Sequence, residues 1–90
     1  MQRKIESIDY SWTFLKKISR LAKRVSDDAE QKATLFKEDA FHPRLHTHKL
    51  HGKYKNYWSF TIVGQYRIMF TFNNKNFIDF VDVGTHEIYK

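Results

Sequence analysis

The spacing of apolar residues changes once along the chain, at the dipeptide His42-Pro43. Before it, apolar residues recur at helical spacing, as in SWTFLKKISRLAKRV, where Phe14, Ile18 and Val25 would lie on one face. After it, apolar and polar residues alternate, as in strands with one buried face. Because the residue before a proline avoids the helical region, helical structure is expected to end here. This change predicts an α+β chain, with helices first and a sheet afterwards.

Two helices are expected in the first half of the chain, over residues 11–25 and 26–40. Ser11 suits the N-cap of the first helix, and Ser26 or Asp27 suits that of the second. The break between them, near residues 25–27, is short. The two segments therefore predict an antiparallel helical hairpin.

Three strands are expected after the proline, over residues 57–63, 66–72 and 77–83, and weak alternation at residues 3–9 predicts a short edge strand before the helices. The N-terminal helical hairpin would then pack on one face of a three- to four-stranded antiparallel sheet. The length suits one domain, and we treat residues 1–90 as a single unit.

The polar face of this sheet follows from a parity argument. In the expected strands 57–63 and 66–72, the alternating apolar residues, such as Phe60 and Ile68, have even numbers. If the two strands are antiparallel neighbours, these residues lie on the same face only when the loop between the strands has an odd number of residues. A three- or five-residue turn, or a bulge, is therefore expected around residues 63–65. Ser59, Thr61 and Arg67 would share the face opposite the core, where we expect the chemistry.

The third strand carries apolar side chains on both faces, which predicts a central strand that is covered on each side. The sequence leaves two orientations open. One set of residues is Ile78, Phe80 and Asp82, and the other is Phe77, Asp79, Val81 and Val83.

Composition excludes several classes of protein. The chain has no cysteine, which excludes disulfides and thiolate metal sites, and no apolar run of 18 residues that would span a membrane. The opening residues lack the apolar stretch of a signal peptide, so a cytoplasmic location is expected. Glycine-rich phosphate loops and nucleophile elbows are absent as well, and the basic middle of the chain holds no paired carboxylates.

Charge is distributed unevenly. The formal net charge is +6, yet the ten acidic residues all lie at or before Asp39 or at or after Asp79. The stretch between them holds six Lys or Arg residues and four of the five histidines. A basic segment of this kind is expected to face an anionic partner such as nucleic acid.

The histidines cluster in the segment HPRLHTHKLHG, at residues 42, 46, 48 and 51. Spacings of four and two residues occur in metal sites, but Pro43 interrupts regular structure and no carboxylate lies nearby to complete a site. We therefore predict no metal and no other cofactor.

A basic surface with histidines can instead cleave RNA without a metal. The 2′-hydroxyl attacks the phosphate, a histidine acts as acid or base, and an arginine binds the phosphate oxygens. His48, Arg67 and His86 would meet if the third strand lies beside the second.

The segments HKLHGKYKNYWSFTIVGQYRIMF and VDVGTHEIY together resemble the RelE/ParE superfamily of type II toxin–antitoxin toxins. The resemblance covers essentially the whole chain and is strongest from His48 to Tyr89. It implies a RelE-like fold and a RelE/YafQ-like mRNA interferase, an endoribonuclease that cleaves ribosome-bound mRNA next to 16S rRNA. It also implies a cognate antitoxin protein that silences the toxin.

The resemblance implies roles for single residues. His48 is similar to the catalytic histidine of YafQ-like toxins, and Arg67 to the phosphate-binding arginine of RelE-like enzymes. His86 falls where YafQ-like toxins carry a histidine and RelE an arginine, so it is the second acid/base candidate. RelE has strand lysines where this chain has Ser59 and Thr61, and YafQ-like toxins have a histidine and an aspartate where it has Thr61 and Gln65. The expected RNA-binding residues are Lys49, Lys53, Lys55, Ser59, Thr61 and Tyr89.

Other readings remain open at this point. Arg67 would form a surface salt bridge to Asp79 or Asp82, His86 would bond the backbone after the Gly84 turn, and Tyr89 would cover an edge of the core. The alternative functions are a ParE-like toxin that inhibits gyrase without RNase activity, or a degenerate family member that only binds an antitoxin. Codon preference, antitoxin identity and the division of acid and base between the histidines do not follow from the sequence.

Overall fold

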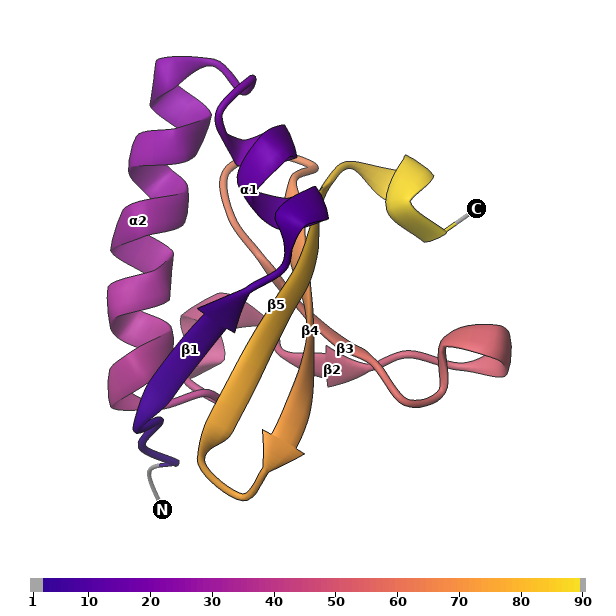
Figure 1. Cartoon of the computed structure of the whole chain (residues 1–90). Helices are drawn as coiled ribbons and strands as arrows, with labels where there is room; N and C mark the ends of the chain where they lie inside the picture. The colour runs from indigo at the N-terminus through magenta and orange to yellow at the C-terminus, as the bar shows by residue number, and fades with distance from the viewer. Residues whose placement is uncertain (1–2, 90) are drawn as a thin grey trace.

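A twisted sheet forms the centre of the molecule, and both helices lie on one of its faces (Figure 1). The structure is a computed structural model that describes residues 3–89, apart from the side chains of Glu87 and Tyr89. The helices and strands, in chain order, are β1 (Ser7–Tyr10), α1 (Trp12–Ile18), α2 (Lys23–Glu38), β2 (His48–Lys49), β3 (Trp58–Thr61), β4 (Arg67–Asn74) and β5 (Phe77–Gly84). Short 3-10 turns are η1 (Pro43–Leu45), η2 (Gly52–Tyr54) and η3 (His86–Tyr89).

The five strands lie in the order β1-β5-β4-β3-β2, and only the contact between β1 and β5 is parallel. The predicted α+β class is confirmed, but a three- to four-stranded antiparallel sheet is wrong in strand number and in direction. Parallel neighbours need a long crossover, and here both helices and the other strands supply it. The two-residue strand β2 is too short to leave a periodic signal in the sequence.

The first helix is shorter than its apolar pattern predicts. Ser11 does cap it, because its hydroxyl accepts a hydrogen bond from the backbone N–H of Phe14 at 3.0 Å. The break falls at residues 19–22 instead of 25–27, and Ala22 takes the N-cap position predicted for Ser26 or Asp27. Val25 is buried inside α2. The apolar spacing continues across the break, because Leu21 packs against the same core, and so it conceals the break.

The core lies between the helices and the sheet, and Phe36 of α2 is at its centre. Its ring stacks on Phe60 at 4.8 Å between centroids and meets Phe70 edge-on at the same distance. Phe14 of α1 contacts Phe80 of β5 at 5.4 Å. Aromatic pairs of this kind hold a small core together efficiently, because each ring buries a large apolar area. They also fix which face of the sheet remains uncovered by helices.

Register settles the orientation of all three main strands. Thr61 pairs with Arg67, so the loop between them has five residues and the parity argument is confirmed. The register between β4 and β5 shifts after Met69 of β4. Met69 pairs with Asp82 and Phe70 pairs with Phe80, so Val81 of β5 has no partner residue in β4. Neither predicted orientation of β5 holds along its whole length, because this bulge reverses the alternation. The buried residues of β5 are Ile78, Phe80 and Val83.

None of the described helices has the length and the apolar composition needed to cross a lipid bilayer.

Candidate functional site

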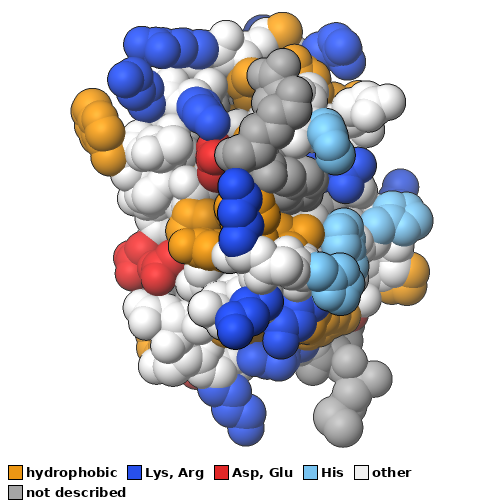
Figure 2. All heavy atoms as spheres, turned by 90° about the vertical axis from the view of Figure 1, so that its right-hand side faces the viewer, with side chains coloured by type: hydrophobic (Ala, Val, Ile, Leu, Met, Phe, Trp, Pro, Cys, Tyr) orange, Lys and Arg blue, Asp and Glu red, His pale blue; other side chains and the backbone are white. Residues whose placement is uncertain are grey.

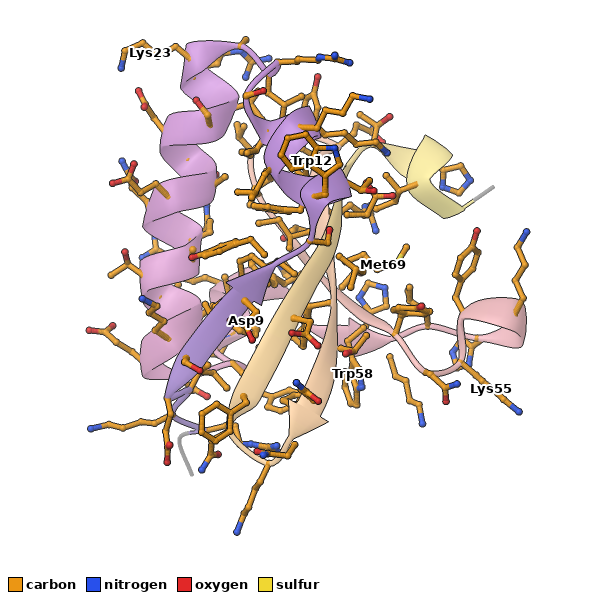
Figure 3. All side chains as sticks on the ribbon, in the orientation of Figure 1. Asp9, Trp12, Lys23, Lys55, Trp58 and Met69 are labelled. Carbon is orange, nitrogen blue, oxygen red and sulfur yellow. The ribbon has the colours of Figure 1, made fainter. Side chains whose placement is uncertain are left out.

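The sheet face opposite the helices displays side chains in register across four strands. One row runs from His48 through Ser59 and Met69 to Asp82, and these residues pair successively from β2 to β5. Figure 3 shows Met69 pointing away from α2, on the side of the sheet without helices, where its side chain is nevertheless buried. We call this surface the open face.

A second row on the open face runs from Thr61 through Arg67 to Gly84. Neighbouring rows on one face of a sheet are about 7 Å apart, because side chains alternate along each strand. The predicted sharing of a face by Ser59, Thr61 and Arg67 is therefore confirmed. Figure 2 looks onto this side of the molecule, where histidine side chains gather at one edge and Lys and Arg side chains extend across it.

His48 lies at the edge of the open face with its imidazole exposed. Its Nδ1 is 3.0 Å from the backbone oxygen of His46, and its Nε2 is 3.4 Å from the hydroxyl of Ser59. An exposed imidazole can accept or donate a proton. Both contacts orient the ring on the open face.

Two hydroxyl groups predicted to bind RNA instead make contacts within the protein. Ser59 is completely buried, which argues against direct contact with RNA, and its hydroxyl lies beside His48. Thr61 is half-buried, and its hydroxyl donates a hydrogen bond to the backbone oxygen of Leu45 at 3.1 Å. Thr61 thereby fastens the segment that leads into β2. In this structure both hydroxyls support the position of His48.

Arg67 is half-buried in β4, and its Nε is buried without a hydrogen-bond partner among the described residues. The predicted alternative, a salt bridge to Asp79 or Asp82, is not formed: Asp82 pairs with Lys17 at 2.7 Å, and Arg67 is in none of the ion pairs between described residues. A buried donor without a partner is costly, so it favours an anionic ligand. Guanidinium suits phosphate because it offers a planar fork of donors.

His86 begins η3 directly beyond β5, and its side chain is exposed. Gly84, two residues earlier, is the register partner of Arg67, so η3 leaves the sheet beside the arginine row. Ile88 holds η3 there, since it is buried and its Cγ2 lies 2.8 Å from where a Cβ on Gly84 would be. The condition stated for this cluster, that β5 lies beside β4, is met. The side chain of Tyr89 lies outside the described residues.

A basic loop projects from the sheet between β2 and β3 (Figure 1). The side chains of Lys49, Lys53 and Lys55 are all exposed, and Figure 3 shows Lys55 at the tip of this projection. The ammonium group of Lys53 lies 5.2 Å from the centre of the Tyr54 ring. Lys49 follows His48 in β2, and Lys53 and Lys55 lie on the projecting loop, so this end of the molecule has the positive charge that suits a phosphate backbone.

Two of the remaining histidines of the cluster have local structural roles. Nδ1 of His42 accepts a hydrogen bond from the backbone N–H of Arg44 at 3.1 Å, which caps η1, and His46 ends η1 in a left-handed conformation. His51 precedes η2. Across the part of the chain that the structure describes, no group of three metal-binding side chains converges.

Sequence reasoning missed two features of the open face. Lys17 and Asp82 form an ion pair there, and the bulge that turns Asp82 onto this face leaves no mark in the sequence. The backbone oxygen of His46 was also missed, because a carbonyl is not visible in residue types. The only available signal was the position of His46 shortly after Pro43, where a tight turn was to be expected.

A family model described as RelE-like toxin of type II toxin-antitoxin system HigB matches residues 3–84. No curated protein sequence gives a significant match.

Several solved structures share the fold. A YoeB/ParE toxin from Agrobacterium tumefaciens is 14% identical, with a TM-score of 0.75 over 90% of this chain and 99% of that one. The DinJ-YafQ toxin-antitoxin complex of E. coli gives 23% identity and a TM-score of 0.66, covering 98% and 97%. The archaeal RelE-RelB complex from Pyrococcus horikoshii gives 16% identity and a TM-score of 0.65, covering 94% and 96%.

Proposed function

Because the chain belongs to the HigB-like family of RelE-like toxins of type II toxin–antitoxin systems, we propose that it is an endoribonuclease that cleaves mRNA on the ribosome. The 2′-hydroxyl of one nucleotide attacks the adjacent phosphate without a metal. His48 and His86 move the protons, and Arg67 stabilises charge on the phosphate. The observation that carries this proposal is the exposed imidazole of His48 on the same sheet face as Arg67, whose buried Nε has no hydrogen-bond partner among the described residues.

Induced expression tests the proposal directly. The wild-type chain is expected to stop growth and to produce cuts in mRNA at the decoding site, mapped by primer extension. Arg67→Ala, His48→Ala and His86→Ala should each restore growth at equal protein levels. Arg24→Ala on exposed α2 and His51→Ala in the basic loop are matched controls that should remain toxic. Toxicity that survives all three site substitutions would refute the assignment.

We further propose that Lys49, Lys53 and Lys55 contact mRNA and 16S rRNA, while Tyr89 positions the nucleotide. Exposed lysines on a projecting loop suit a ribosomal surface dense in phosphate. Action on ribosomes places the protein in the cytoplasm, and we take residues 1–90 to act as one domain. Neutralising all three lysines should weaken ribosome binding strongly at physiological salt and should do so less at high salt.

A cognate antitoxin is the second proposed partner. The similar YafQ and RelE chains were solved with the antitoxins DinJ and RelB. The basic stretch between Asp39 and Asp79 suits an acidic or amphipathic segment of such a partner. Complex formation should therefore weaken as salt rises. Binding that is indifferent to salt would argue against this complementarity.

Inhibition of gyrase is the rival function, favoured by the similarity to a YoeB/ParE toxin. It predicts inhibited supercoiling and DNA damage with intact mRNA, whereas the nuclease predicts the reverse. A chain that only binds an antitoxin predicts neither effect. Primer extension and a supercoiling assay on the same induced cells separate the three.

A further inference from the structure

The imidazole of His48 is held through both of its nitrogens by other groups of the chain. Nδ1 lies 3.0 Å from the backbone oxygen of His46, and Nε2 lies 3.4 Å from the hydroxyl of Ser59. A carbonyl oxygen can only accept a hydrogen bond, so Nδ1 must carry the proton. In the neutral ring, Nε2 then carries the lone pair, and the hydroxyl of Ser59 donates toward it.

The carbonyl of His46 is directed at His48 by backbone conformation. His46 has φ 51°, and it is the only residue other than glycine with positive φ in the described part of the chain. This conformation is uncommon for residues with a side chain. Anchors on either side maintain it: Leu45 is completely buried, and Thr47 donates a hydrogen bond to the backbone oxygen of Ala40 at 2.6 Å.

Ser59 is fixed as firmly as the carbonyl. It is completely buried, and it is the register partner of His48 between β2 and β3. At 3.4 Å its contact with Nε2 is long for a hydrogen bond, so a substrate hydroxyl can replace it. The ring is therefore oriented before substrate binds, on a side chain that is exposed.

We propose that the backbone oxygen of His46 and the hydroxyl of Ser59 are positioning groups that hold His48 as the Nδ1–H tautomer, with Nε2 as the general base. This rests on the proposed nuclease function. Nε2 takes the proton of the 2′-hydroxyl, the 2′-oxygen bonds to phosphorus, and the bond from phosphorus to the 5′-oxygen breaks. The departing 5′-oxygen receives a proton from a second group, for which His86 is the candidate acid.

The role of a backbone carbonyl can be tested through the conformation that directs it. His46→Gly keeps the left-handed conformation without strain, whereas His46→Val resists it because valine is branched at Cβ. With mRNA bound to saturating programmed ribosomes, the glycine variant should cleave like wild type. The valine variant should lose about ten- to a hundredfold in rate with an unchanged half-saturation concentration. Equal losses in both variants would assign the role to the imidazole of His46 and overturn the proposal.

A spectroscopic measurement on the full-length protein separates this inference from the nuclease assignment. Nitrogen-15 NMR of histidine-labelled protein, made by cell-free synthesis, should show neutral His48 protonated at Nδ1 in the wild type and in His46→Gly. In His46→Val this tautomer should decline. A wild-type His48 protonated at Nε2 would overturn the positioning role, whatever the activity. The expected tautomer in a chain that leaves mRNA intact would overturn the base role together with the proposed function.

Discussion

The ammonium nitrogen of Lys17 lies 2.7 Å from Oδ1 of Asp82, and this ion pair joins α1 to the open face of the sheet. Asp82 stands in the same row as His48, so its carboxylate would otherwise repel an incoming phosphate or pair with Arg67. In this structure the carboxylate forms its ion pair with Lys17 and not with Arg67, and we expect this pairing to offset its repulsion of a phosphate. We therefore expect the availability of Arg67 to depend on a residue from a different element.

Removing Lys17 should weaken RNA binding on the open face. In Lys17→Met the carboxylate of Asp82 loses its cation and is free to pair with Arg67. The pair is partly exposed, so we expect a loss of about 1 kcal/mol, or roughly fivefold in the half-saturation concentration for programmed ribosomes. The double variant Lys17→Met with Asp82→Asn should regain most of the affinity. Failure of the double variant to recover would show that Lys17 acts through a contact other than Asp82.

Much of this fold could be predicted from apolar spacing, and the errors lie where spacing carries no information. The odd length of the loop between Thr61 and Arg67 could be predicted, because only an odd number of loop residues places both apolar sets on the buried face. The break between the helices was misplaced because the same apolar stripe continues through it. The direction of β1 depends on a pairing between residues about 70 positions apart, which no local pattern records.

The candidate site was predictable in its residue types and less so in its geometry. Strand alternation was enough to place Arg67 on the open face. The bulge at Val81 decides the orientation of Asp82, and a bulge depends on packing of the whole sheet. The carbonyl of His46 is a backbone group, so its contact with His48 follows from a turn and not from a side chain.

Truncating Phe36 should unfold a large fraction of the protein. Phe36 is completely buried and touches the rings of Phe60, Phe70 and Phe80. Phe36→Ala removes these contacts and leaves a cavity, which we expect to cost about 3–5 kcal/mol. Urea unfolding followed by tryptophan fluorescence measures the change. Phe77→Ala, at a phenylalanine that is 39% exposed, is the control and should cost far less.

Stability should fall in acid partly through Asp39. Its carboxylate accepts hydrogen bonds from the backbone N–H groups of Arg3 and Phe41, both at 3.1 Å, and the bond from Arg3 is the main cause that lowers its pKa below the ordinary 3.8. A lowered pKa means that the folded state favours the charged form. This contribution is therefore complete above the ordinary pKa and is lost as pH falls through the lowered value.

Thermal melting of two variants checks this dependence. At pH 7, Asp39→Ala should melt at a lower temperature than wild type, and the difference should shrink as the pH falls below 3.8 and the wild-type carboxyl group protonates. Asp39→Asn keeps an acceptor oxygen without a charge, so its melting temperature should lie between the two at pH 7. A difference between wild type and Asp39→Ala that stays constant across this range would contradict the proposed linkage.

Gly84 should control activity through the position of η3. A Cβ at this residue would lie 2.8 Å from Cγ2 of Ile88, so Gly84→Ala must push η3, with His86, away from the arginine row. We expect a loss of about 1–3 kcal/mol in stability, as for other overpacked sites, together with a clear fall in the cleavage rate.

Gly64→Ala is the matched control. It also replaces a turn glycine, at φ +62°, but a Cβ there would meet no described atom within 4 Å apart from those of its chain neighbours. That variant should lose some stability through backbone strain and keep the cleavage rate of the folded protein, because it leaves η3 in place. If both variants cleave at the wild-type rate once corrected for the folded fraction, the position of η3 does not limit the reaction.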